Sequence, residues 1–163
     1  MAETQRQPVP RNDDGEIDTA LAFLAFAREC VIKKTDGLSE DDLRRVMVDT
    51  GTSLLGLVQH LTDAERYWFG YHVGGIGQDD FDFSMAVPAD RPAAAVLQDY
   101  RDAIAASDDL LRSITDFDQL MAIPTADRRH SVRWVVAHVT GETTRHAGHA
   151  DILRELIDGT TGR

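Results

Sequence analysis

Apolar residues recur at the three- and four-residue spacing of an α-helix along most of this chain. The pattern predicts four long helices, over residues 14–34, 54–71, 90–114 and 131–157. The last of them would be about 40 Å long at about 1.5 Å per residue, which is enough to run the height of a helix bundle. No segment shows a convincing strand pattern, and no internal repeat is present.

Helix-end signals flank these runs. Ser39 is followed by three acidic residues, which predicts a short connecting helix from there to about Val46. Asp90 precedes Pro92, a pattern typical of an N-cap with proline in the first turn of the third long helix. Gly159 lies just past the last apolar run and predicts a left-handed C-terminal cap there.

The remaining segments are predicted to be loops. Residues 1–12 hold two of the five prolines and no apolar period, so we expect a flexible N-terminal lead-in. Loops are also expected over residues 70–89 and 116–130, and the first of these is long for a compact domain. The economical fold is all-α: a single antiparallel four-helix bundle domain over residues 13–163.

The composition of the chain limits the classes of partner and metal site that we expect. Seventeen basic residues stand against 28 acidic ones, and the net charge of −11 disfavours nucleic acid and anionic lipid. No apolar run approaches the roughly 18 residues of a membrane span, and the N-terminus lacks the apolar core of a signal peptide, so we expect a cytoplasmic protein. Cys30 is the single cysteine, which excludes an internal disulfide and a cysteine-cluster metal site. Any metal ligands must supply nitrogen or oxygen.

The last helix carries a polar interruption in its apolar stripe. The stripe advances by three and four residues and contains three ionisable side chains; its members are Val135, Val139, Glu142, His146, His149, Leu153 and Leu156. Burying a carboxylate and two imidazoles costs several kcal/mol unless they are paired or bind a cation. Glu142 and His146 are four residues apart, a spacing at which two side chains on a helix reach one metal ion.

His60 on the second long helix is the best candidate for a third ligand, because its neighbours there also point inward. Two imidazoles and one carboxylate suit a divalent ion such as zinc and leave a coordination position open, which is the pattern of a catalytic site. Two other interpretations stand beside this one. His60 could be a hydrogen-bonded core histidine, and Glu142 with His146 could be an internal pair without an ion.

The other histidines and the cysteine carry weaker signals. His72, His130 and His138 are interpreted as surface residues or as supports of the ligands, and Cys30 as a core thiol. His149 is a candidate for orienting a ligand or carrying a proton.

The segment from Ser131 to Gly159, above all ETTRHAGHADILR at 142–154, resembles the final helix of the DinB-like bundle superfamily. Within it, the resemblance is to the branch that contains the mycothiol S-transferases and mycothiol-dependent maleylpyruvate isomerase. It extends over nearly the whole chain after the lead-in, since the order of four helices also matches. By motif position, the resemblance implies that His60, Glu142 and His146 bind a divalent metal, most often zinc.

The resemblance also implies an activity. The metal would hold mycothiol, a low-molecular-weight thiol cosubstrate, as a thiolate for attack on a small electrophile, in detoxification or thiol metabolism. Glu142 favours the thiol-transfer branch, because many other superfamily members have histidine at that position. The isomerase has an additional C-terminal domain, whereas this chain stops at Arg163, so we expect a transferase. Relatives of this fold often form homodimers, although no unpaired apolar face in the pattern demands one.

Two other function classes remain open at this stage: a non-enzymatic metal- or ligand-binding stress-response bundle, and a metal-dependent hydrolase in which the open position holds water. The aromatic segment from Tyr67 to Phe83 is a candidate wall of the electrophile pocket. The alternative is an ordinary loop that tucks Phe81 and Phe83 into the core.

Overall fold

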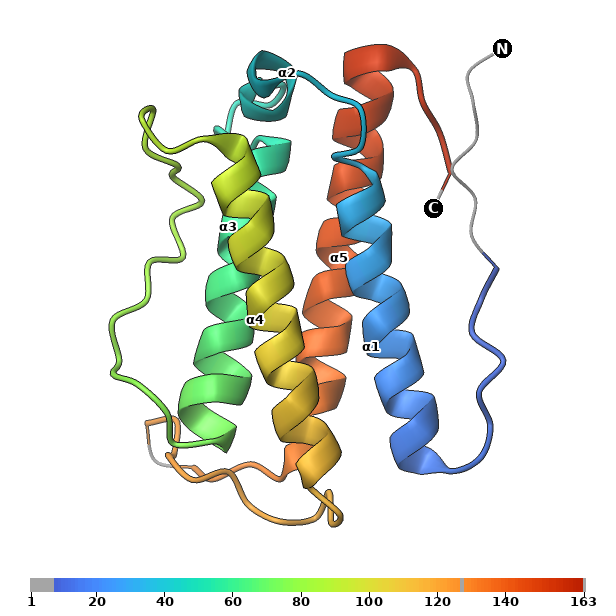
Figure 1. Ribbon diagram of the computed structural model, residues 1–163, viewed down its shortest axis with the longest axis vertical. Helices are drawn as coiled ribbons and strands as arrows, with labels where there is room; N and C mark the ends of the chain where they lie inside the picture. Colours follow the sequence, from blue (N-terminus) through green and yellow to red (C-terminus); the bar gives the residue numbers. More distant parts are fainter. Residues whose placement is uncertain (1–7, 127, 163) are drawn as a thin grey trace.

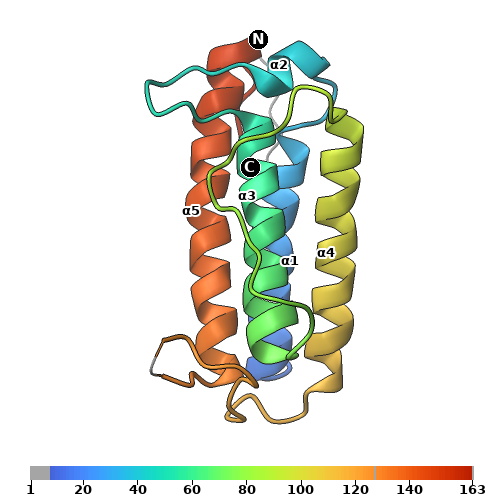
Figure 2. The same ribbon diagram turned by 90° about the vertical axis from the view of Figure 1, so that its left-hand side faces the viewer.

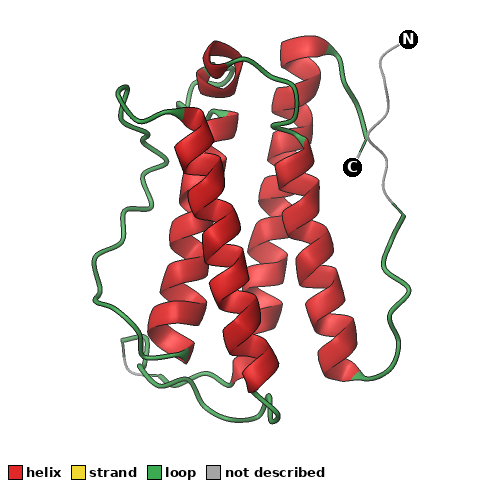
Figure 3. Ribbon diagram, viewed as in Figure 1, coloured by secondary structure: helices red, strands yellow, loops and turns green. Residues whose placement is uncertain are grey.

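The computed structural model describes residues 8–126 and 128–162, and its regular elements are helices. Figure 3 shows helices joined by loops, with no strand among the described residues. The elements are α1 (Glu16–Lys33), α2 (Glu40–Arg44), α3 (Leu54–Glu65), η1 (Arg66–Val73), α4 (Ala93–Ser113) and α5 (Val132–Asp158). The predicted all-α bundle is confirmed.

The four long helices do not simply alternate in direction. In Figure 1, α1 and α5 run upward, whereas α3 and α4 run downward. The most extensive packing is between helices of equal direction, α1 with α5 and α3 with α4. Because α3 and α4 are parallel, the chain must return the length of the bundle between them, and this explains the long loop over residues 74–92. Figure 2 shows this loop crossing the face of α3.

Hydroxyl side chains begin three of the helices as local sequence predicts. Ser39, Ser53 and Ser131 each accept a hydrogen bond from a backbone N–H in the first turn of α2, α3 and α5, respectively. Gly159 ends α5 in the left-handed conformation with φ 77°.

The predicted cap of α4 is wrong. Asp90 does not cap this helix; Pro92 precedes its first residue and has no capping side chain of its own. Instead, both carboxylate oxygens of Glu40 accept from the Ala93 N–H at 3.0 Å, so α2 caps α4 across the top of the bundle. Local sequence could not show this, because the two residues are 53 positions apart.

The second long helix changes its winding after Glu65. Residues 66–73 form η1, a π-helix, in which each turn holds an extra residue. Helical structure therefore extends slightly past the predicted end at Tyr71.

The core consists of two apolar clusters with polar residues between them. One cluster contains Cys30, Val31, Leu57, Leu61, Tyr100 and Leu153 among others. The other contains Leu24, Phe69, Leu111, Val135 and Val139 among others. Arg28, Glu65, Thr143 and His146 lie between these positions along their helices and are buried. The polar middle layer is where chemistry can occur.

The predicted lead-in falls partly outside the described residues, which begin at residue 8. Residues 8–15 follow the outside of α1, where the Thr19 hydroxyl donates to the Asn12 carbonyl oxygen. Within the part of the chain that is described, no helix is both long and apolar enough to cross a membrane.

Candidate metal centre

Three side chains from two helices meet in the middle layer. His60 comes from α3, and Glu142 and His146 come from successive turns of α5, which lies beside α3 in Figure 2. One possible ligand atom from each residue lies within 4.8 Å of the others. The structure thus brings together the three residues that the sequence singled out.

The separations suit a shared cation. Glu142 Oε1 lies 3.0 Å from His146 Nε2 and 3.5 Å from His60 Nε2. Tetrahedral ligands at about 2.1 Å from zinc lie about 3.4 Å from one another. The geometry is therefore compatible with one ion held by two nitrogens and one oxygen.

His60 is short of partners. Both of its ring nitrogens are buried and have no hydrogen-bond partner among the described residues. A buried polar atom that loses water without gaining a partner costs about 1–3 kcal/mol. Among the described residues, His60 thus has no hydrogen bond of the kind that its interpretation as a hydrogen-bonded core histidine requires.

His146 has polar atoms on both sides of its ring. Its Nε2 faces Glu142, and its Nδ1 lies 3.3 Å from Nδ1 of His149. Burial lowers the pKa of His146, and the nearby His60 lowers it further, against the opposing effect of Glu142. A neutral imidazole is the form that binds a metal.

Glu142 is held as a carboxylate. Burial acts to raise its pKa, but hydrogen bonds from Arg145 and His146 outweigh that effect and lower it. Arg145 is largely exposed and donates to Glu142 Oε2 at 2.5 Å, as expected of a solvated partner. The second carboxylate oxygen thus remains directed at the histidines.

The predicted stripe on the last helix is only partly correct. Val135, Val139 and His146 are buried, but His149 and Leu156 are exposed. The buried line passes instead through Thr143 and Ala150, which are small enough for close packing against α1 and α3. His149 therefore lies at the solvent edge of the site and touches it only through His146.

An aromatic group borders His60. The ring of Phe83 lies 5.8 Å from the ring of His60 and 5.4 Å from that of Tyr67. Phe83 remains 41% exposed and Phe81 is half-buried, so the loop does not tuck both rings into the core. The 67–83 segment instead places two aromatic rings, Phe83 and behind it Tyr67, beside His60.

A close approach fixes this loop one helical turn before His60. A Cβ atom on Gly56 would lie 2.7 Å from the carbonyl oxygen of Met85, so only glycine allows the loop backbone to rest on α3 here. Met85 itself has a φ of 62°, an uncommon conformation for a residue with a side chain. The anchor holds the loop segment that carries Phe83.

The remaining histidines behave differently from one another. His72 is buried, contrary to its interpretation as a surface residue, and its Nδ1 lies 2.8 Å from the carbonyl oxygen of Ile123. His130 and His138 lie four residues before and four residues after Trp134. Both rings stack on the Trp134 ring, with centroid distances of 3.7 and 5.0 Å. Cys30 is buried in the core, as expected.

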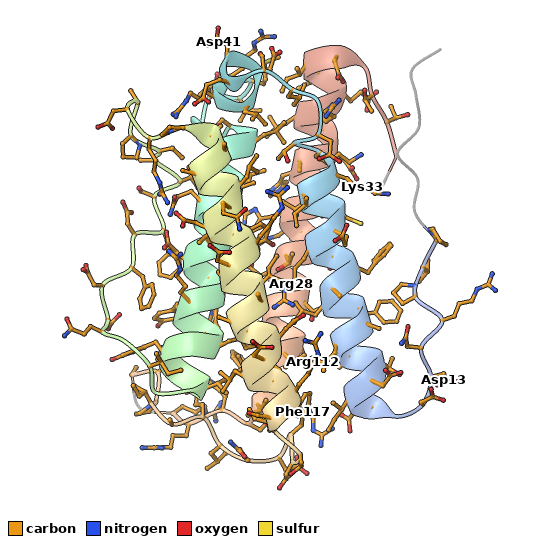
Figure 4. The ribbon with its side chains drawn as sticks, viewed as in Figure 1. Asp13, Arg28, Lys33, Asp41, Arg112 and Phe117 are labelled. Carbon is orange, nitrogen blue, oxygen red and sulfur yellow. The ribbon has the colours of Figure 1, made fainter. Side chains whose placement is uncertain are left out.

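A buried ion network was missed from the sequence. Arg28 extends from α1 into the bundle, where its guanidinium donates to both carboxylate oxygens of Glu65, at 2.7 and 2.6 Å, and to Asp108 at 2.7 Å (Figure 4). The signal was available: Arg28 lies among inward-facing positions of the first helical run, between Leu24 and Val31. Its partners are 37 and 80 residues away, which sequence spacing does not reveal.

Comparison with known families gives one match. A family model described as Mycothiol-S-transferase matches residues 19–159, which extend from within α1 to the residue that caps α5. The match includes all three candidate ligands. Among curated proteins, no sequence matches the chain.

Proposed function

The chain belongs to the mycothiol-S-transferase family, and from this premise we propose that it is a divalent-metal-dependent enzyme that joins the sulfur of mycothiol to a small electrophile. The single observation that carries the metal dependence is that neither buried ring nitrogen of His60 has a hydrogen bond among the described residues, although a carboxylate oxygen lies 3.5 Å from its Nε2 and a second imidazole lies beside it. A cation would bind one of these nitrogens together with the Glu142 oxygen and the His146 nitrogen, and would offset part of the cost of burying them. Zinc is the proposed ion, because two nitrogens and one oxygen are ligands it commonly takes.

His60, Glu142 and His146 would hold the cation. When bound, the ion supplies positive charge that keeps a thiol sulfur deprotonated near neutral pH. A free thiol has a pKa of about 8.5 and is only a few per cent ionised at pH 7. Since Cys30 is buried in an apolar core cluster, the nucleophilic sulfur in this proposal comes from the cosubstrate.

His149 would fix the orientation of His146. With Nε2 of His146 directed at the cation, its Nδ1 carries the proton and donates it to Nδ1 of His149. His149 is exposed and so can pass a proton to water. We propose it as a positioning residue that also carries away the proton released by the thiol.

The electrophile would lie against the aromatic wall formed by Phe83 and Tyr67. In the transfer step a carbon–sulfur bond forms, the bond from that carbon to its leaving group breaks, and the leaving group departs with the electron pair. The wall excludes water from one side of the reacting carbon and orients it toward the sulfur. We further propose a cytoplasmic setting, in keeping with a reduced thiol cosubstrate and the absence of disulfides.

Metal analysis tests the proposed dependence on a divalent ion. Protein prepared without a metal-affinity tag should contain about one divalent ion per chain, as expected for a single three-ligand site. His60→Ala should lose that ion, whereas Gln59→Ala, on the adjacent and half-buried position, should retain it. Absence of a stoichiometric ion from both wild type and Gln59→Ala would contradict metal dependence.

An alkylation assay tests the proposed transfer of the thiol sulfur to an electrophile. The purified holoenzyme is incubated with an alkyl-halide bimane dye and one thiol, and formation of the conjugate is followed. Mycothiol, bacillithiol and glutathione are compared in parallel reactions. Mycothiol should be preferred, and Glu142→Gln should abolish the enzymatic rate while Glu155→Gln, exposed on the same helix, should not. Turnover of an ester without thiol dependence would indicate a metal hydrolase, and no turnover with metal present would indicate a binding protein.

A further inference from the structure

A second cavity lies outside the metal centre. It is half-open, encloses about 490 Å³, and is formed where η1 and α4 face each other beneath the start of the 74–92 loop. Its walls include Gly70, Ile76, Phe81, Ala103, Ala106 and Leu110. None of the three candidate metal ligands lines it.

Small residues on both sides create the space. A Cβ atom added to Gly70 would meet no other atom within 4 Å, so η1 presents bare backbone to the cavity. On α4, the facing positions are Ala103 and Ala106. Volumes of about 300–1,000 Å³ with mainly apolar walls are typical of sites for small molecules.

The charged groups around the cavity largely compensate one another. Glu65, which also lines the cavity, is 1% exposed, and both of its carboxylate oxygens accept hydrogen bonds from Arg28. Arg66 and Asp102 add one charge of each sign to the lining. Arg66 is the one cation in this lining and lies 3.8 Å from Asp99, while Glu65 and Asp102 supply two carboxylates and the chain as a whole carries a charge of −11. An uncharged occupant fits this balance best.

Contacts between aromatic rings link the cavity to the metal centre. Phe81 lines the cavity and its ring lies 5.4 Å from Tyr67, while Tyr67 contacts Phe83, which contacts His60. A series of three ring contacts thus connects the cavity to His60, and of these rings only Phe81 lines the cavity. An occupant of the cavity would contact Phe81, at the end of this series away from the ligands.

We propose that this cavity is a binding site for an uncharged, mainly apolar small molecule, separate from the metal centre. The site does not depend on the proposed transferase activity, because its lining contains no metal ligand. Binding buries the apolar walls formed by Phe81, Ile76 and Leu110 against the occupant.

The test uses two fluorescent probes with the same ring skeleton. N-phenyl-1-naphthylamine is uncharged, and 8-anilinonaphthalene-1-sulfonate adds one anionic group. The uncharged probe should bind one per chain with saturable fluorescence, and the anionic probe should bind about tenfold more weakly, because its sulfonate would enter an apolar cavity whose one cation, Arg66, already faces Asp99. Equal affinity for both probes, or absence of saturable binding of the uncharged one, would overturn the proposal.

Neighbouring alanines on α4 supply a matched pair of variants. Ala106→Leu fills the cavity and should weaken binding of the uncharged probe by about tenfold or more. Ala105→Leu has the same helix propensity but lies outside the lining, so it should bind as wild type. Circular dichroism checks that both variants fold. Wild-type affinity in a folded Ala106→Leu would show that the probe binds elsewhere.

Glu142→Gln and removal of metal distinguish the two sites. Neither change should alter binding of the uncharged probe, because none of the three candidate metal ligands lines the cavity. Loss of probe binding in these two conditions would place the probe in the metal centre and would refute a separate site. A failure of the alkylation assay would leave the outcome of this test unaffected.

Discussion

Two groups of ionisable side chains occupy the middle of this bundle, and they are built in opposite ways. Around Arg28, every buried charge has a direct partner: its guanidinium binds both oxygens of Glu65 and also Asp108. Around Glu142, two imidazoles converge on one carboxylate oxygen, and His60 retains two buried nitrogens without a hydrogen bond among the described residues.

The difference separates a structural network from a site that requires a ligand. A buried ion pair is expensive to break because removing one partner leaves the other uncompensated. Buried polar atoms without hydrogen bonds lower the stability of the fold. Binding of a ligand to these atoms stabilises the fold. Burial alone did not distinguish the two groups, but hydrogen-bond satisfaction did.

The largest effect is expected from breaking the network. Arg28→Met would leave the Glu65 carboxylate buried without its partner and should lower the free energy of unfolding by about 3–5 kcal/mol, measured by urea denaturation. Arg112→Met is the control, because Arg112 binds the same Asp108 at 3.1 Å but is 66% exposed. That change should cost about 0.3–0.5 kcal/mol. Similar small losses from both changes would remove the contrast on which the comparison rests.

In the metal centre, by contrast, loss of a candidate ligand should not destabilise the metal-free protein, and binding of an ion should stabilise it. Zinc at 100 times its dissociation constant should raise the free energy of unfolding of the metal-free wild type by about 2.7 kcal/mol. His60→Leu should abolish this gain and, without metal, should be no less stable than wild type, since it removes two unpaired buried nitrogens. Urea denaturation with and without zinc measures both. A strongly destabilised metal-free His60→Leu would mean that His60 is structural.

A smaller effect is expected at the edge of the metal centre. His149→Ala should weaken zinc affinity by about 10–100-fold, because the proton on His146 Nδ1 loses its acceptor. Competition with a chromogenic chelator gives the affinity, and His149→Asn, which keeps an acceptor, should recover part of it. Unchanged affinity in the alanine variant, with Glu155→Ala as reference, would remove His149 from the site.

The smallest effect is expected from the ion pair between Arg154 and Asp158 at the end of α5, whose carboxylate is partly exposed. Hydrogen bonding to Arg154 lowers the pKa of Asp158 to about 2, and its side chain is 34% exposed. Because the folded pKa lies below the unfolded value, the pair stabilises the fold above about pH 4 and this contribution disappears as the pH falls toward 2. Asp158→Asn should therefore lower stability at pH 7 by less than about 1 kcal/mol and by less still at pH 3. Urea denaturation at the two pH values measures it, and a loss that grows on acidification would contradict the assigned direction.

Much of the site could be predicted from sequence because its strongest signal is local. Glu142 and His146 are four residues apart on one helix, and such a spacing fixes their mutual reach once the helix forms. His60 required only the further expectation that its helix face turns inward. The position of His149 was predicted less well, because a strict alternation of three and four residues drifts relative to the real helix and Ala150 takes the buried place.

By itself, the sequence determined the helices and most of their ends, since the serine caps, Gly159 and the apolar period act within one or two turns. It also determined which residues could serve as ligands. The contact of Arg28 with Glu65, the capping of α4 by Glu40 and the shared direction of α1 and α5 became evident from the folded structure alone. These features depend on side chains tens of residues apart, whose approach is set by how whole helices pack and which buried charges can be compensated.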